Sequence, residues 1–240
     1  MEGKKQDSQA RDKKSRWNSW RRIVGGLALA LAAGLAGAAR PGMARTRREH
    51  NTKSGVTITV RVYNHARVAP DVLSSAERET DSIFRSAGLE IAWIDCPLNV
   101  DQWADYPDCQ AKFGPADFMV KILPPAMAER APWPRTRLAY TTDCGPDLAG
   151  CWAAISYRKV ENLALIAEVP FPLVLGKVMA HELGHMLLGP DHSATGIMRA
   201  ALDTGNFEPG RLPSLVFLDA QRERLHAVVI AARTIHFAAR

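Results

Sequence analysis

The chain has 240 residues, of which 47% are hydrophobic and 23% are charged. These values are typical of one globular domain with a short appendage, and they exclude a wholly disordered, collagen-like or multi-span membrane protein. The net charge of +6 comes from residues 1–44, which hold nine basic and three acidic residues, because the remainder holds 22 of each. A nucleic-acid surface needs its positive charge on the domain that docks, so we expect no nucleic-acid partner.

Residues 1–39 have the pattern of an export signal. Eight Lys and Arg residues precede residues 23–39, an uncharged run rich in Ala, Gly and Leu that ends in small residues. A basic start, an apolar centre and a small-residue exit are typical of a cleaved signal. The alternative is that residues 23–39 remain as a membrane anchor, for which they are short. We therefore expect an exported protein, either secreted, periplasmic or in the cell envelope, that meets a membrane only through an uncleaved leader.

The globular part is predicted to be one domain over residues 55–240. Residues 40–54 are polar and basic without periodicity, which predicts a linker. Alternating β-branched residues at 56–62 predict a strand, an amphipathic pattern predicts a helix from residue 70 to a C-cap at Gly88, and an apolar run predicts a second strand. The order strand, helix, strand indicates a parallel pair of strands.

The second half of the domain continues this pattern. Short apolar runs predict strands at residues 118–123, 138–142 and 153–157. Residues 158–168 fit either a strand or a helix. Residues 173–188 predict a helix that is apolar on nearly all sides and therefore buried, and residues 218–233 predict a last helix. Together the pattern predicts an α/β (α+β) domain with a mixed, mostly parallel sheet and two main helices, whose edge strand lies within residues 138–157.

Four cysteines follow the leader, at Cys96, Cys109, Cys144 and Cys151. An even number in an exported chain favours two disulfides, and the spacings match no zinc-ribbon pattern. Three pairings are possible. The favoured one joins Cys96 to Cys109 and Cys144 to Cys151, because it closes two short loops.

The buried helix carries the sequence His181-Glu182-Leu183-Gly184-His185. Residues i and i+4 share a helix face, so both imidazoles can reach one zinc ion. Glu182 lies beside them, where it can take a proton from a zinc-activated water and pass it to a leaving amine. Two histidines and a glutamate are costly to bury in an apolar helix without such a role.

A third ligand is predicted downstream. Gly189 can end the helix in a left-handed conformation, so that the chain can bring His192 back to the metal. His192 is favoured over its neighbour Asp191, because neutral imidazole suits zinc. A glutamate farther along the chain, Glu208 or Glu223, is a further alternative.

The tract from residue 181 to residue 198 resembles the metzincins, which are zinc peptidases with H-E-x-x-H-x-x-G-x-x-H followed by a methionine-containing turn. It looks most like the matrixin branch. The resemblance implies three histidine ligands, a glutamate general base and a methionine beneath the site: His181, His185, His192, Glu182 and Met198. The predicted order of elements over residues 55–235 is also similar to that fold.

The tract departs from the family pattern by one residue. Leu188 stands where the family has its glycine, and Asp191 stands where it has its third ligand. Gly189 and His192 each come one residue late, and the interval between them is kept. This departure is why Asp191 stays open as the third ligand.

We therefore expect a zinc-dependent endopeptidase with Zn²⁺ as cofactor and a protein or peptide as substrate. An extended peptide is expected to add alongside the edge strand. Tyr140 and Tyr157 are candidates to donate to an oxyanion. The alternatives are a non-catalytic zinc-binding extracytoplasmic module and a plain domain in which the motif arose by chance.

Overall fold

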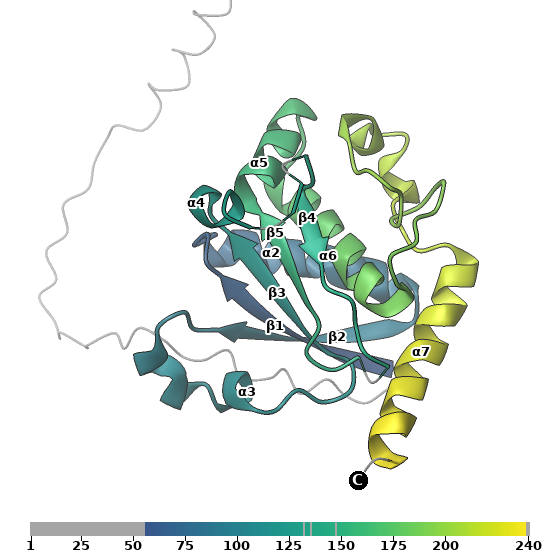
Figure 1. Cartoon of the computed structure of the whole chain (residues 1–240). Helices are drawn as coiled ribbons and strands as arrows, with labels where there is room; N and C mark the ends of the chain where they lie inside the picture. The colour runs from purple at the N-terminus through teal and green to yellow at the C-terminus, as the bar shows by residue number, and fades with distance from the viewer. Residues whose placement is uncertain (1–55, 132, 135, 147, 239–240) are drawn as a thin grey trace, which may run out of the picture. The chain divides into compact units, whose positions relative to one another are not determined.

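The computed structural model describes residues 56–238, apart from residues 132, 135 and 147 (Figure 1). The predicted export signal and linker, residues 1–39 and 40–54, lie outside the described residues. In the part of the chain that the structure describes, no helix has the length and apolar character needed to cross a membrane.

The centre of the fold is one five-stranded sheet with the order β2-β1-β3-β5-β4 (Figure 1). Its strands are β1 (Val56–Asn64), β2 (Leu89–Cys96), β3 (Asp117–Leu123), β4 (Ala139–Thr141) and β5 (Trp152–Ser156). Strands β1, β2, β3 and β5 pair in parallel, and only β4 pairs antiparallel, with β5. The prediction of a mixed, mostly parallel sheet is confirmed, and β4 is an edge strand within residues 138–157.

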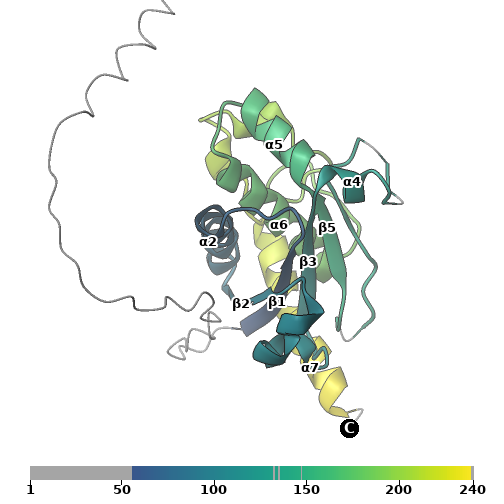
Figure 2. The same ribbon diagram turned by 90° about the vertical axis from the view of Figure 1, so that its left-hand side faces the viewer.

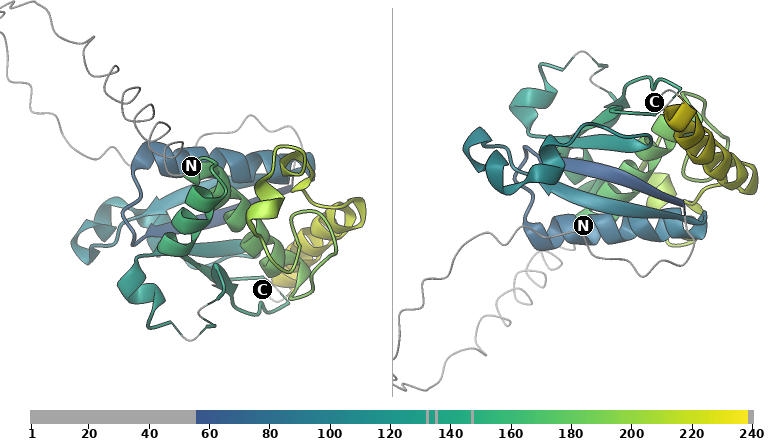
Figure 3. Two further views of the ribbon diagram at one scale, coloured as in Figure 1. Left: turned by 90° about the horizontal axis from the view of Figure 1, so that it is seen from above. Right: turned by 90° about the horizontal axis from the view of Figure 1, so that it is seen from below.

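Four longer helices accompany the sheet: α2 (Pro70–Ser86), α5 (Tyr157–Ile166), α6 (Phe171–Leu188) and α7 (Asp219–Ala238). The ambiguous residues 158–168 are thus mostly helical. The short elements are α3 (Pro107–Gln110), α4 (Pro125–Ala128), η2 (Val100–Asp105), η3 (Thr204–Phe207) and η4 (Leu212–Ser214). Figure 2 shows α2, α5 and α6 on one side of the sheet, and the right panel of Figure 3 shows the opposite face, which these helices leave uncovered.

The core follows from alternation in the strands and periodicity in the helices. Inward-facing side chains of β1 and β3 are fully buried: Ile58, Val60, Val62, Phe118, Val120 and Ile122. They face the apolar side of α2 and the whole of α6. Helix α6 is buried on nearly all sides because α2, α5, α7 and the sheet surround it. The prediction that the motif-bearing helix is buried is confirmed.

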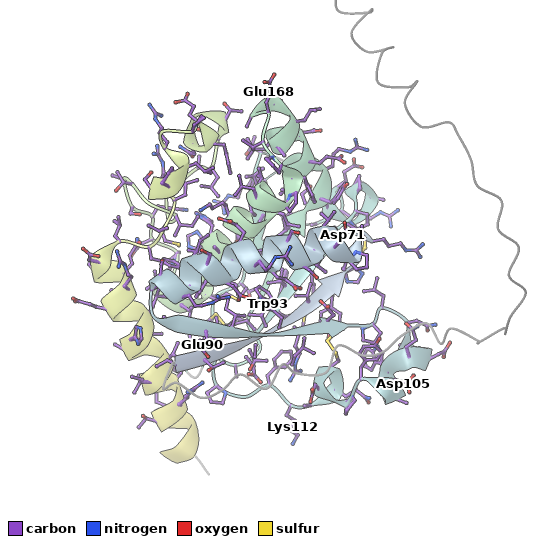
Figure 4. All side chains as sticks on the ribbon, turned by 180° about the vertical axis from the view of Figure 1, so that it is seen from behind. Asp71, Glu90, Trp93, Asp105, Lys112 and Glu168 are labelled. Atoms are coloured by element: carbon purple, nitrogen blue, oxygen red, sulfur yellow. A yellow bond between two sulfur atoms is a disulfide. The ribbon has the colours of Figure 1, made fainter. Side chains whose placement is uncertain are left out.

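Both disulfides have the local pairing, Cys96–Cys109 and Cys144–Cys151. The first holds the loop between β2 and β3, a lobe that carries the labelled Asp105 and Lys112 (Figure 4). The second holds the turn between β4 and β5. Two disulfides indicate a protein of an oxidising compartment, in keeping with the predicted export.

Candidate metal centre

Helix α6 places two histidines of the motif one turn apart on its surface. The helix starts after Pro170 and ends at Gly189, whose φ of 88° is a left-handed conformation that favours glycine. The Nε2 atoms of His181 and His185 lie 3.0 Å apart. Both imidazoles therefore aim at the same point, as the i and i+4 spacing predicts.

The loop after α6 returns to this point and brings a third histidine. The Ser193 N–H donates to the carbonyl of Met198 over 2.8 Å, which closes the loop. The ring of His192 lies 4.8 Å from that of His185 and 5.7 Å from that of His181, centroid to centroid. One nitrogen from each of the three histidines lies within 4.8 Å of the others. The structure thus brings together the three histidines that the sequence motif predicts.

The acidic alternatives stay outside this group. Asp191 precedes His192 in the same loop, but its carboxylate is exposed and does not join the cluster. Glu208 pairs with Arg211 on the surface, and Glu223 is exposed on α7. Among the described residues, the only third donor brought to His181 and His185 is an imidazole.

The hydrogen bonds of the two helical histidines fit a cation between them. Nδ1 of His181 lies 2.8 Å from the Ile197 carbonyl, and Nδ1 of His185 lies 2.9 Å from the Gly189 carbonyl. A carbonyl only accepts, so each Nδ1 carries a hydrogen and each neutral Nε2 carries a lone pair. Two lone pairs that face each other over 3.0 Å repel unless a cation lies between them. This arrangement also supplies the backbone support that metal-bound histidines need.

Burial keeps these imidazoles neutral, which a metal ligand requires. It lowers the pKa of His181 to about 4, against the opposing effect of its bond to the Ile197 carbonyl. Burial also lowers the pKa of His185. Nitrogen ligands of a tetrahedral zinc ion lie about 3.3 Å apart, between the shortest separation of 3.0 Å and the longest of 4.8 Å in this cluster. The three histidines could therefore hold a metal ion.

Glu182 lies next to the cluster, almost completely buried. Its Oε2 accepts a hydrogen bond from the hydroxyl of Thr141, in the edge strand β4. Burial raises the pKa of Glu182 to about 7, while the Thr141 hydroxyl and the charge of Arg137 lower it. A carboxyl group with such a pKa can both accept and release a proton near neutral pH.

Met198 packs against α6 at Gly184, between the two helical histidines. It is fully buried, and a Cβ at Gly184 would come within 2.3 Å of its sulfur and 3.0 Å of the Phe217 ring. Only glycine allows the helix turn between the two histidines to approach this loop so closely.

Lys177, one turn before His181, anchors the same region by its ion pair with Glu79 at 2.9 Å and its bond to the Leu215 carbonyl.

The cluster opens into a cavity of about 810 Å³. Residues 136–144 line it on the side of β4, and α6 with residues 189, 190, 192 and 200–202 lines it on the other sides. In β4, the Leu138 carbonyl accepts from Ser156 and the Thr142 N–H donates to Trp152, so even-numbered residues face β5. By alternation, the N–H and C=O groups of Ala139 and Thr141 face the open edge.

The predicted oxyanion role of the two tyrosines finds no support. Tyr140 lines the cavity, but because the Thr141 side chain points to α6, the Tyr140 ring lies on the opposite face of the sheet. There it packs against Trp133 and Trp152. The Tyr157 hydroxyl donates to Glu161 over 2.8 Å. Neither phenol joins the three histidines.

The site also contains two residues that the sequence did not single out, Thr141 and Arg137. Both lie beside Glu182, which is more than 40 positions away in the chain. Neither belongs to a motif, and β4 is too short for its pattern to show which side chains face the helix.

The sequence matches no protein-family model, and no curated protein is significantly similar to it. The class that the geometry defines is an α/β domain with a mixed five-stranded sheet and a three-histidine group that could bind a metal ion.

Proposed function

We propose that this protein is a zinc-dependent endopeptidase. One observation carries the proposal. Three imidazoles converge beside a buried carboxyl group, inside a cavity whose wall is the open edge of a sheet. The metal donors, the proton acceptor and a backbone surface for an extended peptide thus meet in one place.

The donor set favours zinc. Three imidazole ligands are a common set in zinc enzymes, and a tetrahedral ion with three protein ligands keeps one position open. His181, His185 and His192 would hold the ion. When bound, zinc acidifies a coordinated water and polarises the carbonyl of the scissile peptide bond.

Glu182 is the proton carrier in this proposal. Its carboxylate takes a proton from the attacking water and delivers it to the nitrogen of the leaving amine. The pKa of about 7, caused by burial, matches both directions of transfer near neutral pH. Thr141 is a positioning residue, because its hydroxyl donates to Glu182 Oε2 and holds the carboxylate toward the cavity.

The substrate is an extended peptide that pairs with β4. Ala139 and Thr141 offer two N–H and two C=O groups toward the open edge, which is the surface that β-strand addition uses. Antiparallel pairing is the more stable arrangement, and it continues the sheet beyond β4. A volume of about 810 Å³ is sufficient for several substrate side chains.

The test combines metal content with turnover. Protein produced in an oxidising compartment is expected to bind about one zinc ion per chain and to cleave members of a peptide library. His192→Ala should lower the zinc content, whereas Asp191→Ala, its matched neighbour, should not.

Glu182→Gln should keep the zinc and lower kcat by a factor of about 10²–10⁴, the usual loss on removing a general base. Bound zinc without turnover of any library peptide by the unmodified protein would identify a non-catalytic zinc-binding module. Absence of zinc after refolding with excess metal would remove the basis of the proposal.

A further inference from the structure

The cavity wall formed by β4 and its flanks carries opposite charges at its two ends. Arg137 precedes the strand and Asp143 follows it, and both are exposed side chains that line the cavity. Among the described residues, neither has an oppositely charged side chain within 4.0 Å. Both charged side chains line the cavity, where they can meet charges on a bound molecule.

The backbone of Arg137 is held by two hydrogen bonds. Its N–H donates to the Pro134 carbonyl over 3.0 Å, and its own carbonyl accepts from the Lys159 ammonium over 2.7 Å. Its side chain lines the same cavity as Glu182 and His185. A backbone held just before β4 and a side chain that lines the cavity place Arg137 at one end of the wall.

The direction of the bound peptide decides which of its residues meets Arg137. A peptide antiparallel to β4 has its N-terminal side near Asp143 and its C-terminal side near Arg137. Thr141, which contacts Glu182, marks the level of the scissile bond. Arg137 lies four residues from Thr141, about 13 Å along an extended chain, and its long side chain reaches part of that distance back. It therefore faces the first three residues after the scissile bond.

We infer that Arg137 is a specificity-determining residue that selects a carboxylate on the C-terminal side of the bond to be cleaved. This inference rests on the proposed peptidase function. The carboxylate belongs either to an acidic side chain or to the free end of the substrate. A guanidinium binds it through two parallel hydrogen bonds, which an amide in its place cannot accept. Asp143 repels a negative charge on the N-terminal side of the peptide, so the wall also orients the peptide.

The experiment uses the full chain and matched peptides built on a sequence that the protein cleaves. One series carries Glu or Gln at each of the first three positions after the scissile bond. A second series ends at those positions in a free carboxylate or an amide, which distinguishes the two sources of charge. We expect kcat/KM to favour the acid over its amide by about 10-fold at one position.

Arg137→Gln should reduce this ratio to about one, and Arg137→Glu should transfer the preference to a peptide with Lys at that position. Arg130→Gln, which removes an exposed guanidinium outside the cavity, should keep the ratio. Any effect of the substitution on the rate that both peptides of a pair share cancels in this ratio. A ratio near one in the unmodified protein, or one that survives in Arg137→Gln, would overturn the inference.

A binding measurement separates this inference from the proposed function. Dissociation constants of the peptide pairs are measured by fluorescence anisotropy on Glu182→Gln, with and without Arg137→Gln. If the unmodified protein cleaves no peptide, the pairs are built on the library peptide that it binds most tightly. A charge preference in binding that depends on Arg137 would then support selection of a carboxylate by Arg137 and refute the peptidase. Turnover without a charge preference would refute the inference alone. Absence of both would refute both.

Discussion

In the metal-free protein, His181 and Glu182 make the stability of the fold depend on pH in opposite directions. Replacing Glu182 by glutamine separates these two contributions. Burial lowers the pKa of His181 from 6.5 to about 4 and raises that of Glu182 from 4.5 to about 7. Below pH 6.5 the unfolded chain binds a proton at His181 that the folded chain does not, so acidification destabilises the fold. Between pH 4.5 and 7 the folded chain binds a proton at Glu182 that the unfolded chain does not. The stability from Glu182 is therefore present below pH 4.5 and is lost as the pH rises through 7.

The size of each effect follows from these values. At about 1.4 kcal/mol per pH unit, each pKa shift corresponds to about 3 kcal/mol of stability in full, of which about 2–3 kcal/mol develops between pH 7 and pH 4.5. The signs are opposite, so in the unmodified protein the two contributions nearly cancel over this range. In Glu182→Gln the opposing contribution of Glu182 is absent and that of His181 remains. His185 adds to the His181 contribution, because burial lowers its pKa too.

The assay is urea unfolding followed by tryptophan fluorescence, with a chelator present and both disulfides intact. We expect Glu182→Gln to lose about 2–3 kcal/mol more than the unmodified protein between pH 7 and pH 4.5, a midpoint difference of about 1 M urea. The other titrating groups are common to both proteins, so the difference isolates Glu182. Parallel plots of stability against pH would refute the claim that burial raises the pKa of this carboxyl group.

Two further substitutions test the support of the site. Gly184→Ala forces a Cβ to within 2.3 Å of a buried sulfur, so we expect a loss of about 1–3 kcal/mol in thermal or urea unfolding and weaker zinc binding. Gly210→Ala, where no atom lies within 4 Å of the added Cβ, is the control, and equal losses in the two variants would contradict the packing argument. Thr141→Val removes a bond that lowers the pKa of Glu182, so the acidic limb of the pH profile of kcat/KM should move up by about one pH unit. An unmoved limb would exclude Thr141 as a positioning residue.

The parts of the site that depend on local sequence could be predicted. His181 and His185 share a helix face by periodicity alone, and the helix ends at Gly189 because glycine tolerates the positive φ found there. Ligand chemistry favoured His192 over Asp191, but excluding Asp191 needed the path of the loop, which depends on a bond between Ile197 and Val216 farther along the chain. The motif could nominate both residues, but only the fold places one of them at the other two histidines.

The parts that depend on distant contacts could not be predicted. The bond between Thr141 and Glu182 spans 41 residues, and nothing near either residue signals the other. Residues 158–168 stayed ambiguous because the segment is short and partly exposed, although Val160, Leu163 and Ala164 do form a buried helical face. Tyr140 was a reasonable candidate by chemistry, but a one-residue alternation in β4 turns its ring to the wrong side of the sheet.

The local origin of the metal donors has a practical consequence for measurements on this protein. All three histidines and the two carbonyls that orient His181 and His185 lie within residues 181–197, whereas the Thr141 contact and Arg137 come from a separate segment. That segment is joined to the sheet through a three-residue strand and the turn closed by Cys144–Cys151. In a preparation whose second disulfide is reduced, we therefore expect the three histidines to keep their capacity for a metal ion while the proposed peptide-binding wall is displaced. Zinc content reports on the helix and its loop, and only cleavage or peptide binding reports on the complete cleft.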